Sequence, residues 1–256
     1  MRKPLIALTL LAIVGSVAAW YLLQGPQPAT PLPETGTRDA IQDGETPAAA
    51  IEHPLPAPVP DVPLPSLAES DEPFGSELSM ALGNPSSSAW VNPDNLIRHI
   101  VASVDNLPRR KAAVEQRPVR SPMGPFAVEG DEVTGTLSAA NYPRYDSAMD
   151  ALRATNLSSL VALYKRFYPL FQRAYQDLGY PDGYFNDRLI AVIDHLLATP
   201  SPPEPIGLVR PNVFYEFADP RLEALSTGQK LLIRIGPAHR TLVMGRLKEL
   251  RAELAR

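Results

Sequence analysis

The sequence predicts a mainly α-helical globular domain with one or two short strands or a small hairpin, preceded by one transmembrane helix and a proline-rich linker. Three observations predict this architecture: an uncharged apolar stretch over residues 4–23, eleven of the 29 prolines within residues 24–65, and helix-spaced apolar residues through residues 66–256. We therefore divide the chain into a cytoplasmic N-terminus (1–3), a transmembrane anchor (4–23), a disordered acidic linker (24–65) and a helical periplasmic domain (66–256).

The apolar stretch is long enough to cross a bilayer. Its twenty residues at about 1.5 Å rise span about 30 Å, the thickness of the hydrocarbon core. Trp20 and Tyr21 lie near its far end, where aromatic rings favour the membrane interface. The alternative is a cleaved signal peptide with a small-residue site at residues 16–18. Cleavage there would leave Trp-Tyr-Leu-Leu near the mature N-terminus without evident purpose, so we expect the span to be retained.

Charge predicts the orientation of this span. Arg2 and Lys3 precede it, whereas residues 24–45 hold four acids against Arg38. The positive-inside rule then keeps the N-terminus in the cytoplasm and places the rest in the periplasm, so the expected location is a bacterial inner membrane. Because the chain has no cysteine, a lipoprotein anchor and disulfides are excluded.

The linker composition favours an extended, unpaired chain. Proline fixes φ and removes backbone donors, so residues 24–65 are expected to adopt polyproline II rather than helix or sheet. They would reach about 130 Å fully extended, or about 35 Å as a coil. The linker is interpreted as a spacer that lifts the domain off the membrane. A merely tolerated linker, or a proline-rich ligand for an aromatic groove, are the alternatives.

The charge of the domain bears on its partners. Residues 66–256 carry 22 acids and 21 Lys plus Arg, a net charge of −1. Phosphate binding needs a concentrated cationic surface, so nucleic acid is not expected as a partner.

Helix-spaced apolar residues and end signals place the helices of the domain. The expected helices cover about residues 70–82, 93–107, 145–154, 157–179, 183–198, 220–225, 227–235 and 238–255. Phe74 and Leu78 recur at an i+4 step in the first, and Pro108 ends the second after six apolar residues on one face.

The later helices carry clear boundary residues. Asn156 is the expected N-cap of the long helix, which Gly179 ends. Asp219 followed by Pro220 is an N-cap with proline at N1, and Gly236-Pro237 separates the last two helices.

Extended structure is expected in two places. Residues 108–142 are rich in Pro and Gly, and their apolar pieces Phe126–Val128 and Val133–Leu137 predict a small hairpin or an ordered loop. Val213–Phe217 alternates well enough for one short strand.

Tyrosines of the long helix share its apolar stripe. At 100° per residue, five residues fall within about 40° of Leu157 on the wheel. These are Val161, Tyr164, Tyr168, Phe171 and Tyr175. We interpret the tyrosines among them as core residues with satisfied hydroxyls rather than a sugar- or peptide-binding groove.

No catalytic residue, metal ligand or cofactor site is predicted. His99 is expected to be solvated, and Asp194 and His195 diverge by 100° on a helix, so they do not face each other. The segment Thr227–Lys230 faintly resembles a Ser-x-x-Lys nucleophile pattern, but threonine replaces serine and no Lys-Thr-Gly element accompanies it. We interpret it as a helix start with an exposed Lys230.

The segment Asn141–Asp146 is the best candidate for a binding surface. It brings Tyr142, Arg144, Tyr145 and Asp146 together at the entry to the helices, and Arg with Tyr is a common interface combination. The alternative, which the sequence favours, is an Arg144–Asp146 or capping interaction that only fixes the loop.

Several phrases of the domain together resemble an uncharacterised bacterial family, domain of unknown function 3014. They are Val104-Asp-Asn-Leu-Pro-Arg109, Asn141-Tyr-Pro-Arg-Tyr-Asp146, Tyr168-Pro-Leu-Phe-Gln172, Leu178-Gly-Tyr-Pro181, Leu196-Leu-Ala-Thr-Pro200, Phe217-Ala-Asp-Pro220 and Gly228-Gln-Lys-Leu-Leu232. The resemblance covers about residues 66–256. It implies a Gram-negative envelope protein and nothing about activity.

An anchor and a spacer without a catalytic constellation predict a single-pass inner-membrane protein. Residues 4–23 hold it in the membrane, and its domain is expected to bind another envelope component, an envelope protein or peptidoglycan. The alternative is a periplasmic enzyme or ligand-binding module acting on peptidoglycan, peptide or a small solute, with a pocket where Arg144, Tyr145 or other polar groups converge. A self-associating structural protein is a third hypothesis.

Overall fold

The computed structural model shows a mainly helical domain with a small antiparallel sheet. It describes residues 50–56, 63–81, 93–110, 125–131, 133–212 and 214–255. The predicted anchor (4–23) and most of the predicted linker lie outside these residues. Within the described ranges, no helix combines the length and the hydropathy that a bilayer crossing requires.

The α-helices form at the places that the local signals predict, whereas the two 3-10 helices, η1 and η3, were not expected. They are η1 (Leu67–Glu69), α2 (Asp71–Ala81), α3 (Leu96–Asn106), η3 (Ala139–Tyr145), α4 (Asp146–Ala154), α5 (Leu157–Asp177), α6 (Phe185–Leu197), α7 (Pro220–Glu223), α8 (Thr227–Arg234) and α9 (Pro237–Leu254). The Asn156 side chain accepts a hydrogen bond from the Ser159 amide (3.1 Å), which confirms the predicted N-cap of α5. Asp219 likewise caps α7 by accepting from the Arg221 amide (2.8 Å).

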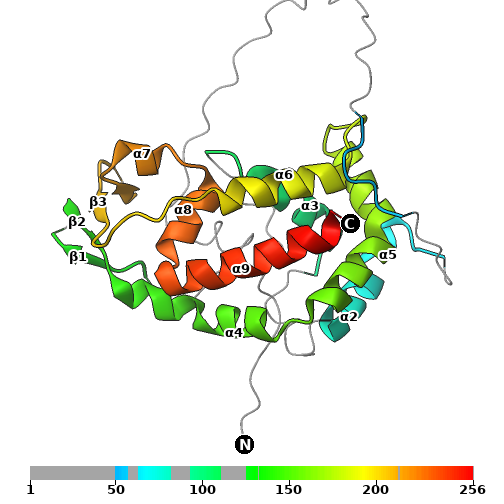
Figure 1. Ribbon diagram of the computed structural model, residues 1–256, viewed down its shortest axis with the longest axis horizontal. Helices are drawn as coiled ribbons and strands as arrows, with labels where there is room; N and C mark the ends of the chain where they lie inside the picture. The colour runs from blue at the N-terminus through cyan, green and yellow to red at the C-terminus, as the bar shows by residue number, and fades with distance from the viewer. Residues whose placement is uncertain are drawn as a thin grey trace, which may run out of the picture.

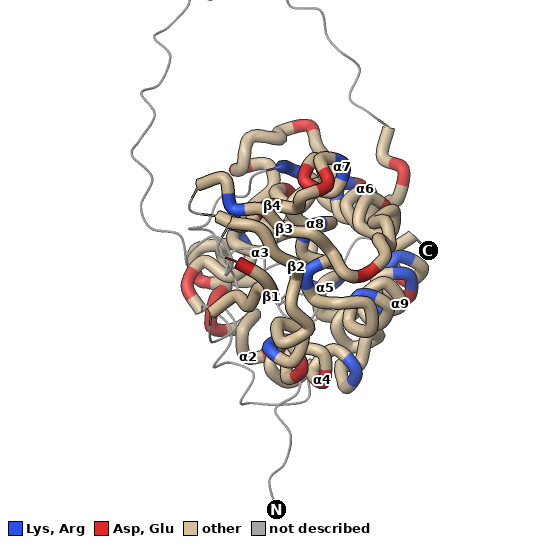
Figure 2. Tube along the Cα trace, turned by 90° about the vertical axis from the view of Figure 1, so that its left-hand side faces the viewer, with Lys and Arg blue, Asp and Glu red and all other residues tan. Residues whose placement is uncertain are grey.

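A four-stranded antiparallel sheet lies at one end of the domain. Its strands, in the order β1 (Val128–Gly130), β2 (Thr134–Leu137), β3 (Gly207–Val209) and β4 (Glu216–Phe217), pair consecutively. The β1–β2 hairpin and β4 were expected from the sequence, whereas β3 was not. Figure 2 views the sheet from its own side and shows acidic and basic residues interspersed around it.

The helices surround one large apolar core. Figure 1 shows α6 and α9 running side by side, with α4 along the other flank of α9 and with α5 and α2 at the end opposite the sheet. Helix α3 packs against both α5 and α6. A second, small core of Leu137, Ile206, Leu208, Phe217 and Ile233 lies at the sheet.

Part of the predicted linker lies against the domain. The prediction of a disordered chain through residue 65 does not hold for residues 50–56, because their backbone groups find partners on and beside α6. The Glu52 and His53 amides both donate to the Asp187 carboxylate. Leu55 and Leu64 also pack against the main core.

Candidate functional site: an apolar cavity in the helical core

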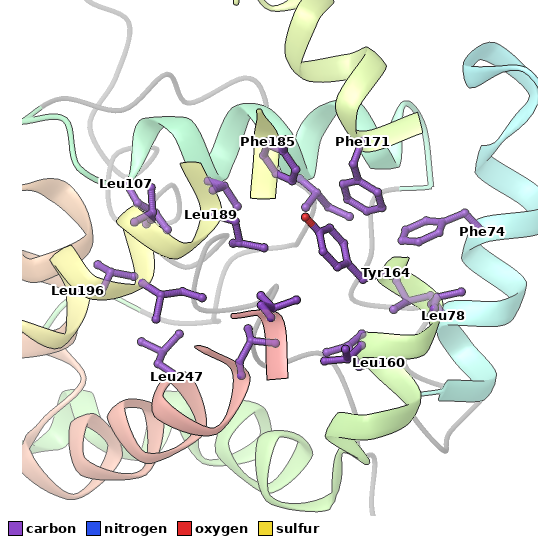
Figure 3. A pocket seen from close by; sticks show the side chains of 18 residues that line it. Phe74, Leu78, Leu107, Leu160, Tyr164, Phe171, Phe185, Leu189, Leu196 and Leu247 are labelled. Carbon is purple, nitrogen blue, oxygen red and sulfur yellow. The ribbon is translucent and has the colours of Figure 1, made fainter. Parts of the chain in front are cut away.

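The main core holds a partly open apolar cavity of about 130 Å³ between helices α2, α3, α5, α6 and α9. Of the eighteen described residues that line it, all but Tyr164 have purely hydrocarbon side chains. Figure 3 shows these side chains converging on a common space. The labelled ones are Phe74, Leu78, Leu107, Leu160, Tyr164, Phe171, Phe185, Leu189, Leu196 and Leu247.

The cavity has an aromatic end and an aliphatic end. At the aromatic end, the Phe171 ring stacks on Phe185 (centroids 5.9 Å apart) and meets Tyr164 (5.2 Å) and Phe74 (5.5 Å) edge to face. Leucines such as Leu196 and Leu247 lie toward the other end (Figure 3).

An empty volume of this size is costly for a folded core. Protein interiors are packed like organic crystals and hold few voids larger than a water molecule. The side chains that line this cavity leave a space that larger side chains could fill.

One polar group touches the cavity, and it is held by a buried amide. The Tyr164 hydroxyl donates to Asn186 Oδ1 (3.3 Å), and burial raises the pKa of Tyr164 well above its ordinary value. Asn186 is fully buried. Its Nδ2 donates to the carbonyl oxygens of His53 (2.9 Å) and Leu254 (3.3 Å).

The lining chemistry limits what can bind here. A charged or sugar ligand would lose its hydration and find almost no hydrogen-bonding partner, so the cavity suits an uncharged apolar group. Leu160, Tyr164, Leu189 and Leu250 line the cavity and are only half-buried. Only one layer of side chains therefore separates the cavity from solvent at these residues.

The residues predicted as a binding surface lie elsewhere, on η3 and the start of α4. Asn141 joins η3 to the sheet, because its side chain exchanges two hydrogen bonds with the backbone of Ala127. Arg144 Nη1 donates to Asn141 Oδ1 (3.2 Å). A contact that fixes this loop is thus present, with Asn141 as an acceptor for Arg144.

Tyr142, Tyr145 and Asp146 also make contacts within the domain. The Tyr142 hydroxyl donates to Glu204 Oε1 (2.5 Å), and burial together with this carboxylate raises the pKa of Tyr142 to about 12. Asp146 Oδ1 lies 3.0 Å from His239 Nε2. Tyr145 is buried, so it is not at the surface where the prediction placed it. None of the four lines the cavity, and binding by them stays a prediction.

The Thr227–Lys230 segment is a helix start, but its lysine is not exposed. Lys230 is buried, and its Nζ donates to Glu223 Oε1 (2.6 Å), so the expectation of an exposed side chain was wrong. The Thr227 hydroxyl donates to the Arg109 carbonyl oxygen (2.8 Å) instead of facing Lys230. The lysine is buried by α7, a contact that the local pattern does not contain.

His99 and His195 are also partly buried. His99 is half-buried rather than solvated, and burial lowers its pKa. His195 Nε2 lies 2.8 Å from Ser226 Oγ, while Asp194 pairs with Arg251, which confirms that His195 and Asp194 do not face each other. Across the described residues, no group of three or more metal-ligating side chains comes together.

The chain matches a family model. A family described as "Protein of unknown function (DUF3014)" matches residues 96–251, which is more than half of the chain and confirms the resemblance over that range. No curated protein and no solved structure matches the chain.

Proposed function

The chain belongs to the DUF3014 family, and we propose that it is a single-pass inner-membrane protein whose helical domain binds the acyl chain of an envelope lipid. The observation that carries this proposal is the 130 Å³ cavity with its almost purely hydrocarbon lining. The lining selects against charged ligands, and the proposed anchor holds the domain beside a bilayer, where acyl chains are the most abundant apolar groups.

The volume of the cavity determines how much of an acyl chain can enter. An apolar cavity of about 150 Å³ in another protein core stays dry and binds benzene. A cavity of about 130 Å³ therefore admits the end of an acyl chain rather than a whole lipid. The rest of the lipid would extend from the cavity to the surface of the domain between the half-buried lining residues.

Photocrosslinking tests this proposal directly. The full-length protein is placed in nanodiscs that contain a phospholipid with a diazirine at the end of one acyl chain, and the labelled residues are mapped by mass spectrometry. We expect label on cavity-lining residues of α5, α6 and α9. Label confined to the predicted span, or spread evenly over the surface of the domain, would contradict the proposal.

A cavity-filling variant and a matched control sharpen this experiment. Leu160→Trp adds volume at a half-buried lining position and is expected to reduce label in the cavity at least fivefold while raising the melting temperature. Met80→Trp adds the same side chain at a position on α2 that is 69% exposed. It should change neither the amount of label in the cavity nor the melting temperature. Leu250→Trp fills the cavity from α9 and replaces Leu160→Trp in this experiment if Leu160→Trp does not fold.

The alternative of a polar-ligand site has weaker support. It requires polar groups converging on a pocket near Arg144 and Tyr145, whereas Arg144 contacts Asn141 and Tyr145 is buried.

A further inference from the structure

The linker segment 50–56, which we call the strap, occupies a defined site beside the start of α6 (Figure 1). The Glu52 and His53 amides donate to Asp187 Oδ2 (3.0 Å) and Oδ1 (2.8 Å), and the Leu55 amide donates to the Tyr184 hydroxyl (2.9 Å). His53 and Leu55 are half-buried while the residues between and beside them are exposed. This alternation is typical of an extended segment with one face against a surface.

The strap and the cavity share one buried side chain. Asn186 Nδ2 donates to the His53 carbonyl oxygen of the strap (2.9 Å), and Asn186 Oδ1 accepts from the hydroxyl of cavity-lining Tyr164 (3.3 Å). The same Nδ2 reaches the carbonyl oxygen of Leu254, another lining residue. Because Asn186 is fully buried, water cannot replace a partner that moves away, and a change at Tyr164 alters how Asn186 holds the strap.

We propose that the strap is a latch whose docking depends on the position of Tyr164 in the cavity wall, with Asn186 as the positioning residue between them. A group that shifts the Tyr164 ring breaks the long 3.3 Å contact and loosens Asn186, and the strap is released. The proposal rests on the proposed function only in the identity of that group, an acyl chain, because the coupling itself is a property of the empty protein.

Release of the strap would change the length of the tether. Leu64 packs against the main core independently of the strap. With the strap docked, the tether from the proposed span would be residues 24–49, about 80 Å if fully extended, and with the strap released it would be residues 24–62, about 120 Å. Occupancy of the cavity would thereby set how far the domain reaches from the membrane.

Hydrogen exchange of the strap amides in delipidated full-length protein, kept in solution with a fluorinated surfactant that supplies no lipid acyl chain, tests the latch without the proposed ligand. Tyr164→Phe removes the hydroxyl that Asn186 accepts from and does not touch the strap, yet we expect Glu52, His53 and Leu55 to exchange about three- to tenfold faster. Tyr175→Phe is the matched control: it removes a hydroxyl from the same helix, and its ring also packs on Phe185 (5.5 Å), but Tyr175 makes no hydrogen bond to Asn186.

Asp187→Asn defines the undocked reference, because it weakens the acceptor of two strap amides and should speed their exchange more than tenfold. Unchanged exchange in Asp187→Asn would show that the strap is not docked and would overturn the proposal. Equal effects of Tyr164→Phe and Tyr175→Phe, or none from either, would overturn the coupling. These outcomes are independent of lipid crosslinking, so the latch and the proposed function can fail separately.

Discussion

Asp105 shows how single residues hold the helices around the cavity. Its buried carboxylate accepts from Arg109 (2.5 Å) in the same segment, from Arg188 Nε (3.0 Å) on α6, and from the Tyr180 hydroxyl (3.2 Å). Burying a carboxylate is costly unless cations and donors surround it. This one cluster therefore fixes α3 against α6, two of the helices that line the cavity.

At the same scale, two histidines make stability depend on pH. Burial lowers the pKa of His99, although the nearby carboxylates of Asp71 and Asp94 act to raise it. Burial together with Arg188 lowers the pKa of His195. Both are neutral in the folded protein at a pH where the unfolded chain already binds protons. Their contribution to stability is therefore present above the unfolded pKa of about 6.5 and is lost as the pH falls toward the folded values.

The free energy of unfolding should accordingly fall between pH 7.5 and pH 5. Urea unfolding of the wild type and of a His99→Gln/His195→Gln variant across this range measures the effect. We expect a shallower decline in the variant, whatever its stability at pH 7.5, since glutamine takes up no proton. If the free energy of unfolding falls equally with pH in the two proteins, neither histidine is responsible for the pH dependence.

At the scale of elements, two glycines of the domain have opposite roles. Gly236 separates α8 from α9 with φ = +91°, and a Cβ there would lie 2.7 Å from the Tyr142 ring. Gly75 lies inside α2, where a Cβ would meet nothing within 4 Å. One glycine is required by its surroundings, and the other only weakens its helix.

Alanine substitutions should separate these roles. Gly236→Ala combines backbone strain with a clash against η3, and we expect it to lower the free energy of unfolding by about 2 kcal/mol or more. Gly75→Ala should raise it by about 0.5–1 kcal/mol. Chemical denaturation of both variants gives the comparison, and a loss of stability in each would contradict the assignment for Gly75.

Elements with signals in their own sequence were predictable, and elements made by distant contacts were not. Asn156 and Asp219 mark helix starts through bonds to the next few residues, so they could be identified locally. Strand β3 pairs with β2, some 70 residues earlier, and no local pattern specifies that partner. The apolar stripes identified which residues are inside, but not that five helices would leave a cavity between them, because packing gaps depend on how facing side chains interdigitate.

The strap was missed for the same reason. Residues 50–56 form neither helix nor strand, as the proline content predicts, but proline content does not exclude docking through the backbone amides of the other residues. Asp187 and Tyr184 supply their acceptors from more than 120 residues away. The Pro-rich composition therefore describes the local conformation of residues 50–56 and not their position.

At the scale of the whole molecule, the proposed function depends on which side of a membrane the domain lies. Arg2 and Lys3 before the apolar stretch predict a cytoplasmic N-terminus and a periplasmic domain. The native chain has no cysteine, so single introduced cysteines report location without background. Asp182 is exposed in the loop before α6, and Asp182→Cys is a suitable reporter.

We expect Asp182→Cys to react with a membrane-impermeant maleimide in cells whose outer membrane has been permeabilised. A cysteine inserted after Met1 should react only after the inner membrane is lysed, because two cations hold that end in the cytoplasm. The intact mass of the protein from the membrane fraction shows whether residues 4–23 are retained. Cleavage after residue 18 would remove the cysteine inserted after Met1. Labelling of Asp182→Cys only after lysis would place the domain in the cytoplasm. The cavity would then face a different set of apolar ligands, although a bilayer leaflet would still lie within reach of the tether.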